Sequence, residues 1–228
     1  MEGTRAVEET EKGMDQEATG PQKPARRLRA DKREAIMDGG REVFAREGYA
    51  RASIDAIATA AGVSTRTVYK HFADKSALFT AVITSSAAQI ADEETALIRR
   101  HLSPSVRAGE LDQTLERFAT QWLTGTKLSA SHRALIGQVH AEAAHLGPEV
   151  ITAWWEAGPG RVLGELSAAL GGLHEAGLLR IPDAERAAAH LSELIAATPG
   201  PPGTRLTRAR REEWIAAGVR VFVRGYRG

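Results

Sequence analysis

The segment Ser53–Phe72, SIDAIATAAGVSTRTVYKHF, places two short helical runs on either side of one glycine. Ser53 and Ser64 each stand directly before a run, where a serine side chain can cap a helix N-terminus. Gly62 lies between the runs, and glycine adopts the positive φ angles of tight turns without a steric cost. The segment therefore predicts a helix-turn-helix, and the rest of the chain must form a fold that can carry one.

The second of these runs has two chemically different faces. Val68 and Phe72 recur at helical spacing and are predicted to point inward. The remaining side chains carry hydroxyl, guanidinium, ammonium and imidazole groups, with no carboxylate among them. Such groups suit the base edges and phosphates of a DNA major groove, although a solvated surface helix could also carry them. They belong to Thr65, Arg66, Thr67, Tyr69, Lys70 and His71.

The chain beyond this segment also has helical periodicity. Asp31 and Glu34 form an acidic variant of a capping box, which predicts the start of the first helix, and Asp74 is predicted to cap a helix that runs towards Arg100. Further helices are expected near residues 111–127, 131–145, 148–176, 183–197 and 207–226. Glycine and proline separate these runs, and no strand-like alternation is found. The sequence predicts an all-α fold with about nine helices.

The composition limits the classes of protein that fit. Of the 228 residues, 43% are hydrophobic and 26% are charged, which is enough to bury a core. With a net charge of +1, DNA binding requires a local basic patch. There is no cysteine for disulfides or thiolate chemistry, and no apolar run reaches the roughly 18 residues of a membrane span. The N-terminus lacks a signal sequence, which favours a cytoplasmic protein associated with the nucleoid.

Residues 1–29 are polar and lack aromatic side chains and helical periodicity, which predicts a disordered tail. The end of this tail is basic. It is either a solvated arm or an arm that reaches phosphates or the minor groove of DNA. The basic residues are Lys23, Arg26, Arg27 and Arg29, followed by Lys32 and Arg33.

Taken together, these motifs resemble the TetR/AcrR family of bacterial one-component transcriptional regulators. The resemblance spans about Asp31 to Ile83 and rests on "F…EGY", "SIDAIATAAGVS", "TVYKHF" and "DKSALF". It implies a helix-turn-helix DNA-binding domain over residues 30–75. Residues 76–228 are then expected to form a helical domain for ligand binding and dimerisation.

The resemblance also implies roles for single residues. Those expected to meet bases are Thr65, Arg66, Thr67 and Lys70. The other expected DNA contacts are Ser53, Ser64, Tyr69, His71 and Lys75. Arg66 is the expected guanine reader, because its forked guanidinium matches O6 and N7 together. Lys75 is expected at a phosphate, because a helix N-terminus presents free amides and a partial positive charge.

One helix-turn-helix reads a single half-site, so a double-stranded palindromic operator requires a homodimer. The resemblance implies an interface made by the helices near 183–197 and 207–226, which carry apolar stripes. These stripes could also pack within the monomer. They consist of Ala187, Ala188, Leu191, Leu194 and Ile195, and of Trp214, Ile215, Val219, Phe222 and Val223.

The middle helices contain Trp122, Trp154, Trp155 and His140. Aromatic residues with a few polar groups are typical of small-molecule pockets, so these four are the candidate ligand contacts for a bulky hydrophobic effector. Each could equally be a core or surface residue. Because Trp154 and Trp155 are neighbours, they point about 100° apart on a helix and are not expected to face one pocket simply.

No motif favours catalysis. His140 and His145 in HAEAAH stand five apart, whereas zinc proteases need histidines four apart. The glycine-rich segment Gly158–Gly164 follows no strand, so it predicts a helix break and not a nucleotide loop. No metal, cofactor or enzyme activity is therefore expected. Two interpretations remain: a repressor released from its operator by a small hydrophobic ligand, and a DNA-binding regulator without such an effector.

Overall fold

The computed structural model describes residues 24–124, 130–142, 146–197, 199–200, 204 and 206–227. These residues form ten α-helices, one short 3-10 helix (Ala108–Glu110) and no strand, which confirms the predicted all-α fold. The α-helices are α1 (Pro24–Arg51), α2 (Ile54–Ala60), α3 (Thr65–His71), α4 (Lys75–His101), α5 (Leu111–Thr124), α6 (Ala130–Glu142), α7 (Pro148–Ala157), α8 (Pro159–Glu175), α9 (Ala184–Ala196) and α10 (Arg208–Tyr226).

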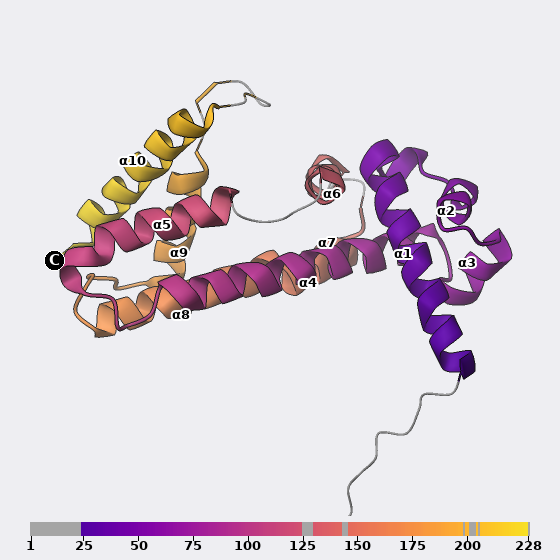
Figure 1. Cartoon of the computed structure of the whole chain (residues 1–228), viewed down its shortest axis with the longest axis horizontal. Helices are drawn as coiled ribbons and strands as arrows, with labels where there is room; N and C mark the ends of the chain where they lie inside the picture. The colour runs from indigo at the N-terminus through magenta and orange to yellow at the C-terminus, as the bar shows by residue number, and fades with distance from the viewer. Residues whose placement is uncertain are drawn as a thin grey trace, which may run out of the picture.

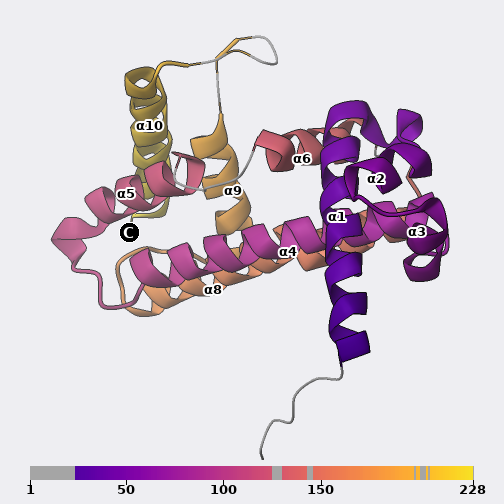
Figure 2. The ribbon, with the colours of Figure 1, turned by 45° about the vertical axis from the view of Figure 1, so that its right-hand side comes forward.

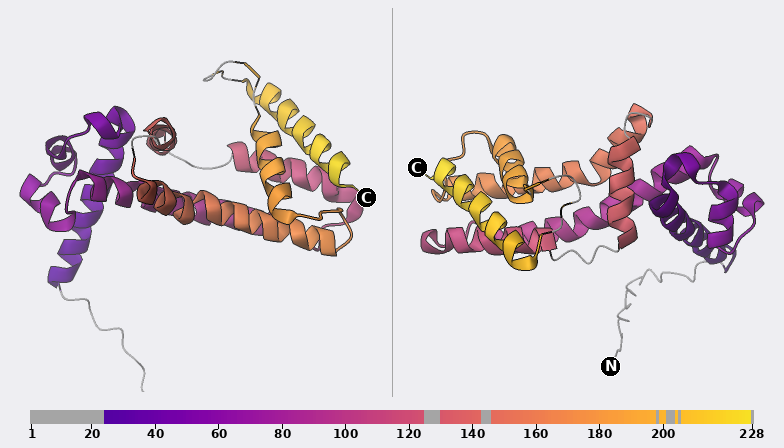
Figure 3. Two further views of the ribbon diagram at one scale, coloured as in Figure 1. Left: turned by 180° about the vertical axis from the view of Figure 1, so that it is seen from behind. Right: turned by 90° about the horizontal axis from the view of Figure 1, so that it is seen from above.

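The chain folds into a small head and a long body (Figure 1). The head consists of α1, α2 and α3, and the body consists of α4 to α10. α4 leaves the head and runs the length of the body with α7 and α8 beside it. α5, α9 and α10 pack together at the far end, while α6 packs on α1 (Figure 2). The views from behind and above show the head standing at one end of the body (Figure 3).

Two hydrophobic cores hold these parts. The core of the far end joins α4, α5, α8, α9 and α10. The core of the head contains side chains of α1, α2 and α3 but also of three body helices, so the head is not packed independently of the body. The body side chains in it are Leu78, Phe79, Val82, Ile83 and Ala87 of α4, Leu135 and Val139 of α6, and Val150 and Trp154 of α7, together with Leu146 before α7.

The first helix begins earlier than the sequence predicts. α1 starts at Pro24, so the capping box predicted at Asp31 is wrong, and Asp31 lies inside the helix. Proline is favoured in the first turn of a helix because it has no backbone N–H to satisfy. Of the tail predicted for residues 1–29, residues 1–23 lie outside the described residues and the remainder belongs to α1. The basic residues Arg29, Lys32 and Arg33 are therefore fixed on a helix.

Residues 148–176, which the sequence predicts to be helical, form two helices, because α7 and α8 are separated at Gly158. Pro159 disfavours a helical conformation at the residue before it, and the Gly158 backbone leaves the helical region (φ −128°, ψ −90°). A Cβ atom on Gly158 would lie 2.7 Å from the Cβ atom of Ala87 on α4. The helix break predicted for this glycine-rich segment is thus present and lets the chain pass close to α4.

The apolar stripes predicted for the dimer interface are largely used within the monomer. All of their side chains except Leu194 and Trp214 are buried in the described chain, where α9 and α10 pack on each other, on α5 and on α8. Packing of these stripes within the monomer, the alternative that the sequence leaves open, therefore accounts for most of the side chains, and a dimer interface made by α9 and α10 stays a prediction. Helical periodicity identifies an apolar face but not the chain that covers it.

Gly218 allows α10 to approach α9 closely. A Cβ atom at this position would lie 2.4 Å from the backbone oxygen of Leu194. We expect Gly218→Ala to lower the free energy of unfolding by about 1–3 kcal/mol through overpacking, measured by thermal and denaturant unfolding. Gly164→Ala in α8 is the matched control, because a Cβ atom there meets nothing within 4 Å; it should be neutral or stabilising. Equal effects of the two substitutions would contradict this packing.

Candidate DNA-binding surface and ligand pocket

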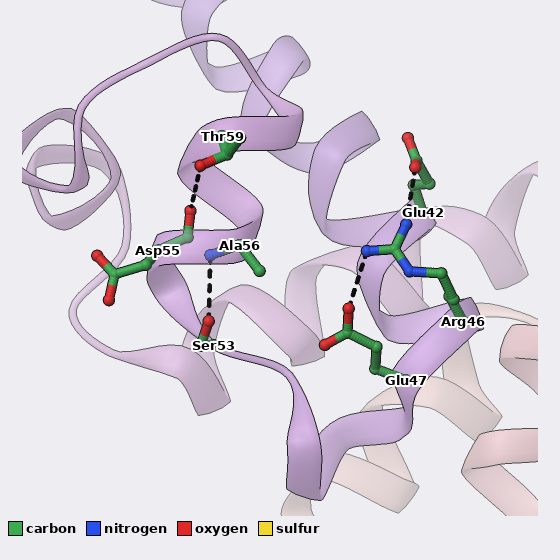
Figure 4. Close-up of polar contacts among 7 residues, drawn as sticks. All are labelled: Glu42, Arg46, Glu47, Ser53, Asp55, Ala56 and Thr59. Atoms are coloured by element: carbon green, nitrogen blue, oxygen red, sulfur yellow. Dashed lines mark hydrogen bonds and ion pairs between the residues drawn. The ribbon is translucent and has the colours of Figure 1, made fainter.

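The turn between α2 and α3 has the geometry that the sequence predicts. The Ser53 side chain accepts a hydrogen bond from the Ala56 amide at 3.1 Å (Figure 4), and the Ser64 side chain accepts one from the Thr67 amide at 3.2 Å. Gly62 adopts a φ angle of 63°, which is the left-handed conformation that favours glycine. Both serine caps are confirmed, and together they fix the orientation of α3 on the head.

α3 presents its polar side chains to solvent. Val68 and Phe72 are buried as predicted, while Tyr69 is 56% exposed. The exposed side chains also include Ser64, Arg66 and Lys70; Thr65, Thr67 and His71 are half-buried. Two acidic residues of α1 are paired within that helix: the Arg46 guanidinium donates to the carboxylates of Glu42 at 2.9 Å and Glu47 at 2.8 Å (Figure 4). α3 itself contains no carboxylate, so it offers donors and positive charge only.

The N-terminal half of α1 extends this surface. Leu28, Arg29 and Lys32 of α1 and Thr67, Lys70 and His71 of α3 line an open groove of about 590 Å³, called the basic groove below. Burial lowers the pKa of His71, and the charges of Arg29, Arg33, Lys32 and Lys70 lower it further. The groove therefore has a positive potential that favours an anionic partner such as a phosphate backbone.

Lys75 has a different environment from the one expected for a phosphate contact. Its ammonium group donates to the backbone oxygens of Tyr49 (2.9 Å), Ala50 (3.3 Å) and Ala52 (3.0 Å). It also lies 4.6 Å from the centre of the Tyr49 ring. An ammonium group has three hydrogens, so these oxygens satisfy all of them. Lys75 fastens the end of α1 to the start of α4, and a phosphate contact would require breaking these bonds.

The end of α1 is also bonded to α6. The Glu142 carboxylate accepts a hydrogen bond from the Tyr49 amide at 3.0 Å. Gly48 has a φ angle of 78°, and a Cβ atom there would lie within 2.8 Å of both the Glu142 and the Gln138 side chains. The sequence gives no sign of the bond from Tyr49 to Glu142, because the two residues are 93 positions apart in the chain.

All four predicted ligand contacts line one cavity of about 350 Å³, called the pocket below. Trp122 comes from α5, His140 from α6, and Trp154 and Trp155 from α7; α4, α8 and α9 close the rest of the wall. Both neighbouring tryptophans line the pocket, although their directions on a helix make this arrangement unexpected. α7 ends at Gly158, and the indole nitrogen of Trp155 lies beside Gly160, 2.8 Å from where a Cβ atom would stand. The helix break thus places Gly158 and Pro159 in the same pocket wall as Trp155.

Glu94 of α4 is a pocket residue that sequence reasoning missed. Burial raises the pKa of its carboxyl group from 4.5 to about 7; a hydrogen bond from the Trp122 indole opposes this rise, and the charge of Glu93 adds to it. A signal was present in the sequence, because Glu94 continues the helical spacing of the apolar residues Ile90 and Ile98. An acid on an apolar stripe indicates either a buried partner or a functional site.

Two further site types find no support in the described part of the chain. None of its helices combines the length and the apolar character that crossing a bilayer requires. No group of three His, Cys, Asp or Glu side chains there could hold a metal ion. His145, the second histidine of the HAEAAH motif, lies outside the described residues.

Glu94 should make the stability of the protein depend on pH. Because its pKa is higher in the folded chain, folding binds a proton, and stability falls as the pH rises from 4.5 through about 7. Glu94→Gln should therefore raise the melting temperature at about pH 8 and change it little at about pH 5. The upper limit of the gain is about 3 kcal/mol. Glu93→Gln, on the exposed neighbour, is the control, and parallel pH profiles of wild type and Glu94→Gln would contradict the assignment.

Comparison with known proteins agrees with this architecture. Residues 36–82 match the family of bacterial regulatory proteins of the tetR type, and residues 110–228 match the C-terminal domain of AefR-like transcriptional repressors. No curated protein matches the sequence.

Solved structures are similar over almost their whole length. A TetR-family transcriptional regulator from Mesorhizobium loti is 29% identical, with 88% of this chain and 98% of that chain covered and a TM-score of 0.75. The flavonoid-responsive regulator FrrA is 25% identical, with coverages of 87% and 98% and a TM-score of 0.62. A TetR regulator from Agrobacterium tumefaciens shares the fold at 21% identity, with coverages of 86% and 94% and a TM-score of 0.58.

Regulators of this family bind DNA operators and dimerise, and they are not enzymes. The two family matches agree with the helix-turn-helix head and the helical body. The second match alone spans more than half of the chain. The chain belongs to the TetR family of transcriptional regulators.

Proposed function

We propose that this protein is a sequence-specific transcriptional repressor that binds a palindromic operator as a homodimer and is released by a small hydrophobic ligand. The observation that carries the DNA-binding part is the outward, carboxylate-free surface of α3 beside the basic groove. We place the protein in the cytoplasm, at the nucleoid, because this is where its operator would be.

The proposed DNA contacts divide by chemistry. Thr65, Arg66, Thr67 and Lys70 read bases from α3. Ser53, Ser64, Tyr69 and His71 contact the backbone together with Arg29, Lys32 and Arg33 of α1. Lys75 is left out of the phosphate contacts, because three backbone oxygens already occupy its ammonium group. We assign it instead to holding the head at a fixed angle on α4.

We propose that the dimer forms through the outer face of α9 and α10. An open, mostly apolar groove lies on this face, where Val221 is 58% exposed. His190 and Tyr226 meet at its edge, with 2.9 Å between the imidazole nitrogen and the hydroxyl oxygen. A twofold partner would bury this face and place two α3 helices side by side for successive half-sites. The groove is lined by His190, Glu193, Leu194, Ala197, Val221, Phe222, Gly225 and Tyr226.

The pocket is proposed as the effector site, and its walls suggest how a ligand acts on the head. His140 lines the pocket from α6, and Glu142 on the same helix holds the Tyr49 amide at the end of α1. Trp154 lines the pocket and is also part of the head core. A ligand that displaces either element favours a different head angle, and it weakens operator binding only by its differential affinity for the two states.

The response of FrrA to flavonoids, at 25% identity, supports an effector for this chain too. The alternative, a regulator without an effector, fits a body that is packed throughout. A cavity of about 350 Å³ lined by aromatic side chains favours the ligand-controlled version.

The test of the proposed function is selection of bound duplexes from a random library by the purified protein. A palindromic consensus is expected. Arg66→Ala should then cost about 1–3 kcal/mol of binding free energy at one base position of each half-site. Lys32→Ala is the matched control, because it removes a charge at a proposed phosphate contact: it should weaken all sequences alike and lower the salt slope by about 0.9 for each phosphate that is no longer neutralised. A uniform loss with Arg66→Ala would overturn its role, and a library without a consensus would overturn sequence-specific binding.

The proposed interface gives a second prediction. Val221→Glu places a charge in the centre of the α9–α10 groove, so we expect a monomer by size-exclusion chromatography with light scattering and a loss of operator affinity. Ala96→Glu, on an exposed position of α4, is the control for adding one negative charge. A Val221→Glu protein that remains dimeric would show that the interface lies elsewhere.

A further inference from the structure

We propose that the effector is a hydrophobic organic cation, held with its positive nitrogen at the Glu94 carboxylate and its apolar part among the pocket tryptophans. This inference rests on the proposed function, in which the pocket is the effector site. It adds the charge and the chemical class of the ligand and assigns Glu94 as the residue that selects it.

The charges around the pocket give the first argument. Glu94 is the only acidic residue among the described lining residues, and neither lysine nor arginine is among them. Two arginines on helices that line the pocket, α8 and α4, are paired with other acids: Arg161 binds Asp92 at 2.7 Å, and Arg99 binds Glu165 at 2.6 Å. His140 is the other titratable side chain of the wall. The pocket, as far as its described wall extends, therefore contains an acid without a fixed cationic partner.

The hydrogen bonding of Glu94 gives the second argument. Its carboxyl group accepts a hydrogen bond from the Trp122 indole, whereas an ionised carboxylate has about four acceptor positions. A buried carboxylate is costly unless an opposite charge and further donors compensate the lost water. An ammonium group bound in the pocket supplies both. A ligand carboxylate would instead place two like charges together in a poorly hydrated site.

The aromatic wall gives the third argument. The ring faces of tryptophan attract cations more strongly than those of other side chains, and the attraction increases when the site is dry. Trp122, Trp154 and Trp155 surround the same cavity as Glu94, and the His140 ring meets Trp154 edge-on with 5.4 Å between their centres. A volume of about 350 Å³ accommodates a ligand with one or two aromatic rings. Carboxylate and rings together therefore favour a cation with an apolar body.

This arrangement predicts the sign of the pH dependence. With the pKa of Glu94 raised to about 7 by burial, a cation that binds the carboxylate form displaces a proton from the protonated form. Affinity should rise with pH through about 7 and level off above it. Glu93 adds negative charge from α4, and the Asp92–Arg161 and Arg99–Glu165 pairs are neutral overall. His140 is the other titratable side chain of the pocket wall, so its contribution is measured with a separate variant.

The test uses three probes with one ring system: naphthylethylammonium, naphthylethanol and naphthylacetate. Binding to the full-length protein is measured by isothermal titration calorimetry at about pH 8 and about pH 6. We expect the cation to bind at least about tenfold tighter than the alcohol at the higher pH, with no detectable binding of the anion. The affinity of the cation should fall about tenfold at the lower pH, where about a tenth of the carboxyl groups remain ionised. The alcohol should be unaffected by pH.

Variants assign these effects to residues. Glu94→Gln should reduce the affinity of the cation to that of the alcohol and remove most of its pH dependence. Unchanged binding of naphthylethanol would show that the variant pocket is folded. Glu93→Gln, one residue away and exposed, should change cation binding much less than Glu94→Gln does, because the charge of Glu93 is the smallest contribution to the raised pKa of Glu94. His140→Gln measures the share of the pH dependence that comes from the imidazole.

Equal affinity for the three probes, a preference for the anion, or a cation preference that survives in Glu94→Gln would overturn the proposal. Failure of all three probes to bind would overturn it as well. The proposed function fails separately, because operator selection is carried out without any effector. If naphthylethanol binds and releases operator DNA as well as the cation does, the effector site is supported and the cation is excluded.

Discussion

The orientation of the DNA-binding head depends on how the last turn of α1 is held. A helix C-terminus leaves backbone oxygens without partners, and here the Lys75 ammonium satisfies those of Tyr49, Ala50 and Ala52. The Glu142 carboxylate accepts a hydrogen bond from the Tyr49 amide of the same segment. Lys75 of α4 and Glu142 of α6 thus both bind the short segment from Tyr49 to Ala52. Since hydrogen bonds to charged groups are among the stronger ones in proteins, the angle between head and body is set by two body helices at once.

These two helices are also walls of the pocket, so the head and the pocket share structural elements. α4 contributes Glu94 to the pocket, and its Lys75 binds the end of α1. α6 contributes His140 to the pocket, and its Glu142 binds the end of α1. Trp154 adds a third connection through the head core. Packed interiors do not deform continuously, so a ligand that shifts α4 or α6 is expected to move the head between discrete positions and not to loosen it gradually.

The sequence predicts those features that are encoded locally. Serine caps, the Gly62 turn and the buried pair Val68 and Phe72 depend on residues within a few positions of one another, and all are confirmed. Contacts between distant segments, such as the hydrogen bond between Tyr49 and Glu142, cannot be predicted from local patterns in the sequence. For the same reason the sequence leaves open what covers the α9 and α10 stripes: amphipathic periodicity is the same whether a helix packs on its own chain or on a partner. The four pocket residues were found because aromatic side chains are few, whereas Glu94 was hidden among many charged residues.

Glu94 shows why an acid in an apolar pocket can persist despite its cost. An ionised carboxyl group there destabilises the folded chain near neutral pH, and an apolar residue of similar size would avoid the penalty. The same desolvation penalty makes the pocket specific for a cationic ligand, because only a ligand with a positive charge compensates the buried carboxylate. Its place on α4 adds a mechanical consequence. A ligand that pairs with Glu94 binds to α4, and the first residue of α4, Lys75, binds the end of α1 in the head. Recognition of the effector and control of the head are then properties of one helix.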